Sequence, residues 1–78
     1  MKILIRNLAR TTTEAELLTL FQGHGAVQSC NLVIDNDTGL SKGFGFVEMP
    51  KPGEAKAAIN SLNGIAIAGF KIRVKKSE

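Results

Sequence analysis

Glycine and phenylalanine alternate in the segment Lys42–Met49, which reads Lys-Gly-Phe-Gly-Phe-Val-Glu-Met. Successive side chains of a β-strand point to opposite faces of the sheet, so one face receives both glycines and the other both phenylalanines. A slip of one residue would bring Val47 and Met49 into water, which specifies the register strongly. We therefore predict two phenylalanine rings on a sheet face open to solvent, and we expect the glycines to let helices approach the opposite face closely. The predicted open-face residues of this strand are Lys42, Phe44, Phe46 and Glu48.

Two helix patterns separate the strands of the chain. The first helix begins at a capping box formed by Thr13 and Glu16, in which the hydroxyl and the carboxylate each bind an unpaired backbone N–H. Gly23 and Gly25 are expected to end this helix, because a left-handed conformation costs glycine little, and Asn63-Gly64 ends the second. Each helix carries one apolar stripe at helical spacing. The stripes are Leu17, Leu20 and Phe21 in the first helix and Ala55, Ala58, Ile59 and Leu62 in the second.

The strand and helix patterns follow the order β-α-β-β-α-β, which is that of the ferredoxin-like α+β fold. The helical stripes need a sheet to bury them, and two helices can cover only one of its faces. A short strand over residues 65–67, turning at Gly69, precedes the last strand. The chain shows no repeat, linker or low-complexity segment, so we predict one domain over residues 1–78. The four main strands are predicted at Lys2–Arg6, Val27–Ile34, Lys42–Met49 and Phe70–Lys75.

The cations of the chain are sorted by surface. Ten Lys and Arg outnumber seven Asp and Glu, which gives a net charge of +3. Alternation in the first and last strands places Leu4 on the open face and Phe70, Ile72 and Val74 on the covered face. Six of the ten cations then share the open face with the two rings, where Glu48 is the one acid. A basic face with exposed rings suits single-stranded nucleic acid, because cations hold phosphates and rings stack bases. The six cations are Lys2, Arg6, Lys42, Lys71, Arg73 and Lys75.

At these residues the chain resembles the RNA recognition motif family. Lys42–Met49 is similar to the family's octapeptide at seven of eight positions, and Ile3–Leu8 is similar to its hexapeptide. The resemblance continues through the capped first helix, the Asp-Thr-Gly turn and the second helix, and so covers essentially the whole chain. It implies a four-stranded antiparallel sheet, with the two motif strands adjacent in the middle, that binds short single-stranded RNA on its open face.

The resemblance also implies roles for individual residues. Phe44 and Phe46 would stack on bases, Lys42 would contact a phosphate or a base, and the last strand would add a further contact surface. Met49 replaces the octapeptide's final aromatic residue, but it faces the core and should not affect binding. Leu4 stands where the hexapeptide usually offers an aromatic residue, so one of three stacking platforms is missing. The candidate RNA-binding residues are Lys2, Leu4, Arg6, Asn7, Lys42, Phe44, Phe46, Glu48, Lys71, Arg73 and Lys75.

Other site chemistries fit the sequence less well. Small acyl-phosphate hydrolases share this topology, but no nucleophile is paired with a base and His24 has no evident partner, so we predict no catalytic residues and no enzymatic activity. One cysteine and one histidine cannot form a closed zinc site. Leu40 and Phe46 occupy the positions where a calcium loop needs Gly and Glu. We therefore expect no metal, no cofactor and no small-molecule substrate.

The sequence leaves two questions about the partner open. One is whether single-stranded DNA is accepted as well as RNA, and the other is whether the chain is instead a protein-binding module that uses its sheet or a helix face.

Met1–Arg10 has no apolar run long enough for a signal peptide, and no span of about 20 apolar residues follows. We therefore expect a cytoplasmic protein with no membrane partner. We also expect it to be a monomer.

Overall fold

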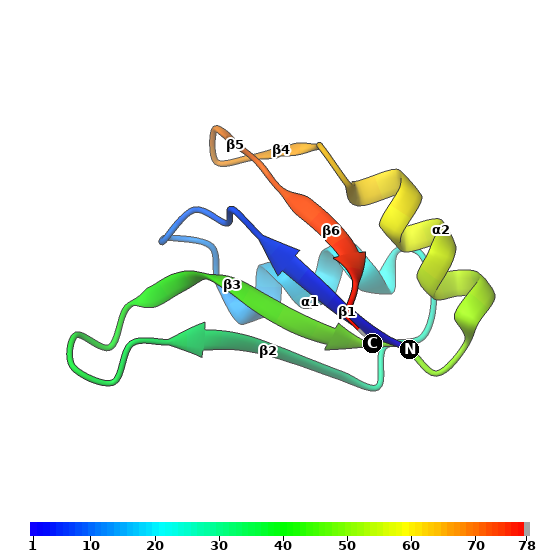
Figure 1. Cartoon of the computed structure of the whole chain (residues 1–78), viewed down its shortest axis with the longest axis horizontal. Coiled ribbons are helices and arrows are strands. Elements are labelled where there is room, and N and C mark those ends of the chain that lie inside the picture. Colours follow the sequence, from blue (N-terminus) through cyan, green and yellow to red (C-terminus); the bar gives the residue numbers. More distant parts are fainter. Residues whose placement is uncertain (78) are drawn as a thin grey trace.

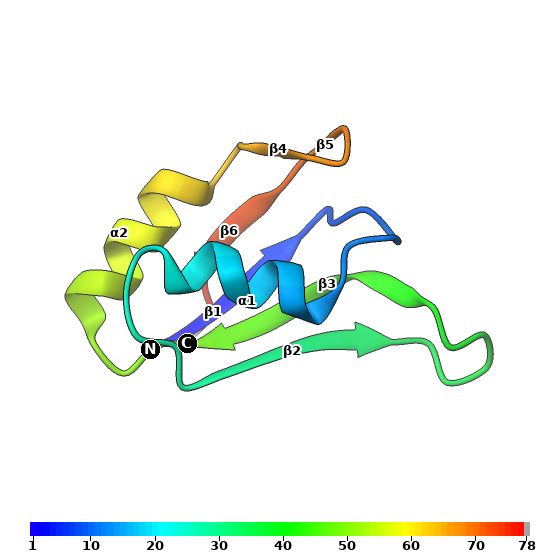
Figure 2. The ribbon, with the colours of Figure 1, turned by 180° about the vertical axis from the view of Figure 1, so that it is seen from behind.

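The computed structural model describes residues 1–77, which form a four-stranded sheet, a short hairpin and two helices. The order β-α-β-β-α-β is confirmed, with the hairpin inserted before the last strand. Figure 1 shows the uncovered side of the sheet, and Figure 2 shows the opposite side, where α1 crosses in front of the strands. The elements are β1 (Lys2–Arg6), α1 (Glu14–Gln22), β2 (Ser29–Ile34), β3 (Ser41–Glu48), α2 (Pro52–Leu62), β4 (Ala66–Ile67), β5 (Phe70–Lys71) and β6 (Arg73–Lys76).

The strands of the main sheet lie in the order β2-β3-β1-β6, and each is antiparallel to its neighbours. The octapeptide strand β3 and the hexapeptide strand β1 are therefore adjacent in the middle, as the resemblance implied. β2 begins at Ser29 rather than at the predicted Val27. Neither central strand has a free edge, so the side chains of both are held in a defined register.

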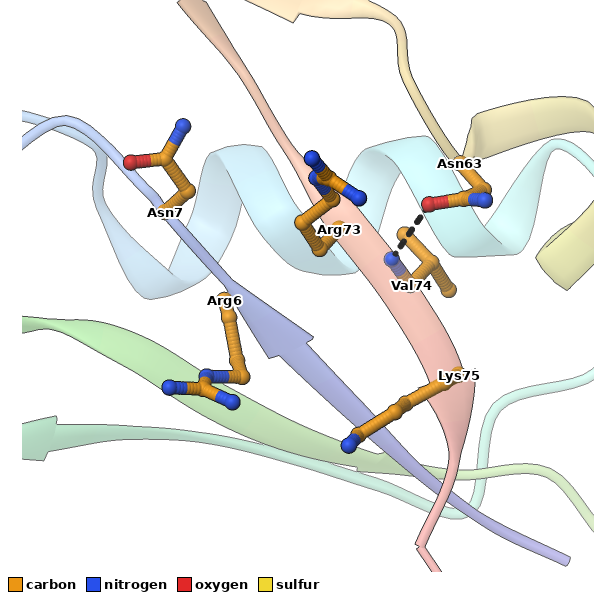
Figure 3. Close-up of a pocket in the computed structure, with 6 residues that line it drawn as sticks. All are labelled: Arg6, Asn7, Asn63, Arg73, Val74 and Lys75. Atoms are coloured by element: carbon orange, nitrogen blue, oxygen red, sulfur yellow. Dashed lines mark hydrogen bonds between the residues drawn. The ribbon is translucent and has the colours of Figure 1, made fainter.

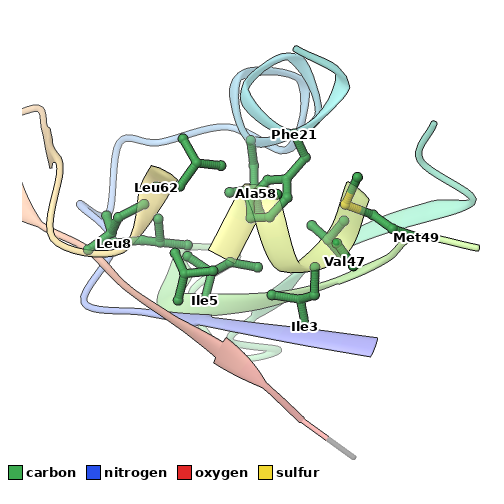
Figure 4. Close-up of a cluster of buried hydrophobic side chains, with 12 residues drawn as sticks. Ile3, Ile5, Leu8, Phe21, Val47, Met49, Ala58 and Leu62 are labelled. Carbon is green, nitrogen blue, oxygen red and sulfur yellow. The ribbon is translucent and has the colours of Figure 1, made fainter. Parts of the chain in front are cut away.

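The core lies between the covered face of the sheet and the two helices (Figure 4). Ile3, Ile5 and Val47 are fully buried, and the residues that alternate with them on β1 and β3 face outward. Burying one such side chain stabilises the fold by about 1.5–3 kcal/mol, so a one-residue slip would lose several of these contributions at once. Met49 is also fully buried, as predicted. The buried helical residues of the core are Leu17, Phe21, Ala55, Ala58 and Leu62.

The first helix begins as predicted but ends differently. Thr13 is its N-cap, and the Thr13 hydroxyl accepts a hydrogen bond from the Glu16 N–H at 3.2 Å. The Thr13 hydroxyl also donates a hydrogen bond to the Glu16 carboxylate at 3.2 Å. The bond that the Glu16 side chain accepts in this capping box therefore comes from the Thr13 side chain. Gly23 caps the other end at a right-handed φ of −65°, so the predicted left-handed cap is wrong. The second helix ends as predicted, with Asn63 as its C-cap and Gly64 following at a left-handed φ of 88°.

The two glycines of β3 make room for backbone rather than for helices, which corrects the expectation from the sequence. A methyl group added at Gly45 would lie 2.6 Å from the Asn31 carbonyl oxygen on β2. One added at Gly43 would lie 3.1 Å from the carbonyl oxygen of Leu8, and Gly43 has a φ of 87° that few other residues tolerate. The glycines therefore let β3 lie close against the neighbouring β2 backbone and the chain that leaves β1.

The predicted last strand is divided in two. β5 pairs with β4 through Ile67 and Phe70, and only β6 joins the main sheet beside β1. Ala68 and Gly69 link β4 to β5 with φ values of 52° and 84°, as in the two-residue turns that reverse a hairpin. Two placements from the sequence are therefore wrong. Phe70 is 46% exposed instead of lying in the core, and Lys71 lies in the hairpin instead of on the open face of the main sheet.

Candidate nucleic-acid interface

Two phenylalanine rings lie at the centre of the uncovered face. Phe44 and Phe46 are both half-buried and alternate on β3 with buried residues, which confirms the predicted parity of this strand. Their ring centroids are 6.4 Å apart and their planes meet at 85°, an edge-to-face contact. Because both rings stay on the surface, each presents an apolar, π-rich patch to solvent.

The antiparallel register aligns a row of side chains across the sheet at Phe46. Phe46 lies opposite Asn31 of β2 on one side and opposite Leu4 of β1 on the other, and Leu4 in turn lies opposite Lys75 of β6. Leu4 is half-buried on the open face, as predicted, while Lys75 is exposed. Asn31 is exposed and was not among the predicted site residues. The row therefore places an amide, a ring, an aliphatic side chain and an ammonium group side by side.

A second cross-strand pair, Lys2 and Glu48, brings opposite charges to one end of the face. The Lys2 ammonium nitrogen lies 4.8 Å from the centroid of the Phe46 ring, a cation–π arrangement. Glu48 is half-buried on the same face, as its place in the alternation predicted. At this end, the positive charge of the face is partly balanced by a carboxylate.

Cations gather where β1 lies beside β6. Arg6 of β1 and Arg73 of β6 are cross-strand partners, and both side chains are exposed. They line a hollow together with Lys75 (Figure 3). At its border, the Asn63 side-chain oxygen accepts a hydrogen bond from the Val74 N–H at 3.0 Å. This hollow offers three cationic side chains to an anionic ligand.

Asn7 has a structural contact as well as a place near the site. Its φ of 60° lies in the left-handed region, and its side-chain NH2 donates to the Lys71 carbonyl oxygen at 2.8 Å. This bond fastens the β4–β5 hairpin to the end of β1. Asn7 was predicted to contact RNA, whereas the contact that the structure gives it positions the hairpin.

The single cysteine lies away from the open face. Cys30 Sγ is 3.7 Å from the backbone oxygen of Glu14, at the start of α1. Burial, and then the negative charge of Glu14, raises the pKa of the Cys30 thiol to about 11. The thiol is therefore protonated near neutral pH, which makes it a poor nucleophile.

Within residues 1–77, no helix is long and apolar enough to span a lipid bilayer.

Comparison with known proteins places these features in a family. Residues 3–73 match the model of the RNA recognition motif. The putative RNA-binding protein RbpB of Nostoc sp. is 38% identical over 78 residues, which are 100% of this chain and 76% of RbpB. The 29 kDa chloroplastic ribonucleoprotein of Arabidopsis thaliana is 39% identical over 77 residues, but the match spans 99% of this chain and only 22% of that protein.

Solved structures agree with the sequence relatives. The crystal structure of RNA binding protein PG1 has a TM-score of 0.95 and 40% identity, with 99% of this chain and 93% of that chain covered. The Rna15 RRM with bound RNA (GU) has a TM-score of 0.89 and 25% identity, with 97% and 81% covered. The family model spans most of the described residues, and the octapeptide strand lies at the centre of the sheet. The chain belongs to the RNA recognition motif family.

Proposed function

We propose that this chain binds a short single-stranded RNA across its uncovered sheet face and performs no catalysis. The observation that carries the proposal is the pair of half-buried rings, Phe44 and Phe46, which lie among cations on the sheet face that the helices leave open. Solved structures similar to this chain include the Rna15 RRM with bound RNA (GU). They support the choice of RNA as the ligand.

Base stacking on the two rings provides the non-ionic part of the affinity. Each base stacked on an aromatic side chain contributes about 1–3 kcal/mol, largely without regard to base identity. Because the rings are nearly perpendicular, at 85°, the bases on them must also differ in orientation. Two or three splayed nucleotides then occupy the centre of the face, and Asn31 beside Phe46 is placed to donate or accept a hydrogen bond at a base edge.

The cations of the face hold the phosphates between these bases. Arg6 and Arg73 lie side by side across β1 and β6, and Lys75 lines the same hollow. Guanidinium groups suit phosphates because their planar N–H donors match two phosphate oxygens at once. The ionic contribution should therefore be concentrated on the β1–β6 side of the rings.

We also propose that the chain acts as a monomer, because the edges of its sheet are partly protected. The Leu32 N–H on the edge strand β2 donates to the Glu14 carboxylate at 3.1 Å. The Val74 N–H on the opposite edge strand, β6, donates to the Asn63 side chain at 3.0 Å. Side chains that occupy backbone donors of an edge strand hinder its pairing with another chain.

The double substitution of Phe44 and Phe46 by Ala tests the function. Fluorescence anisotropy with labelled homopolymer RNAs should show a loss of affinity of more than tenfold, because two stacks are removed. The thermal midpoint should stay nearly unchanged, since the rings lie outside the buried core. Leu18→Ala, on α1, is the control and should bind RNA like the wild type.

Backbone amide shifts measured in the same titration separate RNA binding from the rival function. RNA should move the signals of β1 and β3. If no homopolymer RNA or DNA moves them, nucleic-acid binding on this face is excluded and the protein-binding alternative gains weight. Comparing each RNA with the DNA of the same sequence would establish which sugar is preferred.

A further inference from the structure

The open face continues beyond the main sheet into a second hollow. It lies where the chain leaves β1, next to the start of β3 and to the β4–β5 hairpin, and has a volume of about 270 Å³. Figure 1 shows the hairpin projecting from the sheet on the side where β1 ends. Phe44 lines this hollow from β3, and Phe70 lines it from the hairpin. One of the two proposed stacking rings therefore shares a hollow with a third aromatic ring.

Phe70 lies on a fastened stretch of backbone, although its side chain is 46% exposed. It lies opposite Ile67 in the hairpin, directly after the turn formed by Ala68 and Gly69. The Asn7 side chain binds the carbonyl oxygen of the next residue, Lys71, at 2.8 Å, which ties the hairpin to the end of β1. An exposed ring on a backbone fastened in this way can receive a planar ligand with little loss of conformational freedom.

The hollow is also basic. The charged side chains that line it are Arg6, Arg10 and Lys42, and all three are cations. Arg10 donates from Nη1 to the Ser41 carbonyl oxygen at 3.0 Å, which orients its guanidinium group beside the start of β3. A guanidinium group has five N–H donors, so others are available to a phosphate.

We propose that Phe70 is a third base-stacking residue, and that it forms with Phe44 and Arg10 a nucleotide pocket at the hairpin end of the open face. The pocket takes the nucleotide next to the one stacked on Phe44, with the base on Phe70 and its phosphate on Arg10 and Lys42. This inference rests on the proposed RNA-binding function. It extends the bound strand past the main sheet, on the opposite side of Phe44 from Leu4.

The test compares Phe70→Ala with Ile34→Ala, which removes a side chain of similar exposure, 44%, from the edge strand β2. Affinities are measured for homopolymer RNAs of increasing length. Phe70→Ala should weaken binding of RNAs of four or more nucleotides by at least about fivefold and leave dinucleotide binding unchanged, because one stack is lost. Ile34→Ala should bind every RNA like the wild type. Phe70→Trp should retain or tighten binding, because it keeps a flat ring.

The outcomes distinguish this pocket from the function on which it rests. If Phe70→Ala binds every length like the wild type while the Phe44 and Phe46 double variant loses binding, the pocket is wrong and the proposed function stands. If the wild type binds no RNA, both fail. Should Phe70→Ala unfold, Phe70→Leu keeps apolar bulk without a flat ring, and wild-type affinity in that variant would also overturn the pocket.

Discussion

Replacing Leu4 by Tyr tests whether a bound strand passes over the middle of β1. Leu4 is half-buried on the open face, between Phe46 of β3 and Lys75 of β6 in the cross-strand register. Its aliphatic side chain can touch a base but offers no flat π-surface. A tyrosine here would stand in the row with Phe46, where it would add a stacking surface without entering the core.

The expected gain follows from the geometry of that row. One additional stack contributes about 1–3 kcal/mol, which corresponds to roughly five- to two-hundredfold in Kd. The cross-strand aromatic pair that the new ring would form with Phe46 would add about 0.2–1 kcal/mol to stability. In a domain of this size, that raises the thermal midpoint by at most about 8 °C. Leu4→Tyr should therefore bind RNA at least about fivefold more tightly and be at least as stable as the wild type.

Isothermal titration calorimetry with homopolymer RNAs measures the change directly. Leu18→Tyr makes the same substitution at a half-buried position on α1, on the other side of the sheet, and should leave the affinity unchanged. Unchanged affinity in Leu4→Tyr, together with an intact fold, would refute the reasoning. It would show that RNA does not pass over this position.

Three further predictions concern charge, packing and the thiol. The logarithm of the RNA affinity should fall against the logarithm of salt with a slope of about −2 to −3.5, for three to five neutralised phosphates. Arg73→Ala should flatten that slope, whereas Lys56→Ala on α2 should not. Gly45→Ala should destabilise the fold by about 1–3 kcal/mol in thermal unfolding, because its methyl group would meet the β2 backbone at 2.6 Å; Gly53→Ala, which meets nothing within 4 Å, should not destabilise it. At pH 8, folded Cys30 should react with a disulfide reagent about tenfold more slowly than Cys30 of the unfolded chain. The thiolate fraction is about a hundredfold smaller in the folded state, but a thiolate of higher pKa is more nucleophilic and offsets part of this difference. Its pKa is raised from 9.0 to about 11, so the folded state holds the proton more tightly and stability should fall as pH rises through this range.

The residues at the centre of the open face could be predicted, because the residues that must be buried on one side of β3 determine which residues lie on its other side. Val47 and Met49 have to be buried, and the strict alternation then leaves Phe44 and Phe46 no place but the surface. The structural role of the two glycines could not be predicted in the same way. The atoms that leave no room for a side chain at Gly45 belong to β2, so they depend on how closely β2 approaches β3. That approach is a property of the assembled sheet and not of the strand's own sequence.

The short strand over residues 65–67 and its turn at Gly69 were predicted, but the strand that pairs with it was not, because the turn lacks the usual residue signal of a hairpin. Two-residue hairpin turns with positive φ at both positions favour Asn-Gly or Asp-Gly, whereas here Ala68 stands at the first position with φ 52°. Without that signal, the alternation of residues predicts one strand over Phe70–Lys75, whereas the structure has two strands here, β5 and β6. Asn31 was not predicted because three consecutive apolar residues, Leu32–Ile34, follow it in the sequence, so alternation does not indicate which face of the sheet it occupies.

The two ends of the open face differ in charge, and this difference determines where we expect a bound strand to be held most firmly. At one end Glu48 lies opposite Lys2, and the Lys2 ammonium already lies 4.8 Å from the centroid of the Phe46 ring, so an arriving base shares that ring with a cation. At the other end Phe44 lines a hollow whose charged residues are all cations. Attraction for phosphates grows with uncompensated positive charge, so we expect a nucleotide at Phe44 to be held more firmly than one at Phe46. A ring added at Leu4, beside Phe46, should therefore strengthen the part of the proposed site where we expect the weaker binding.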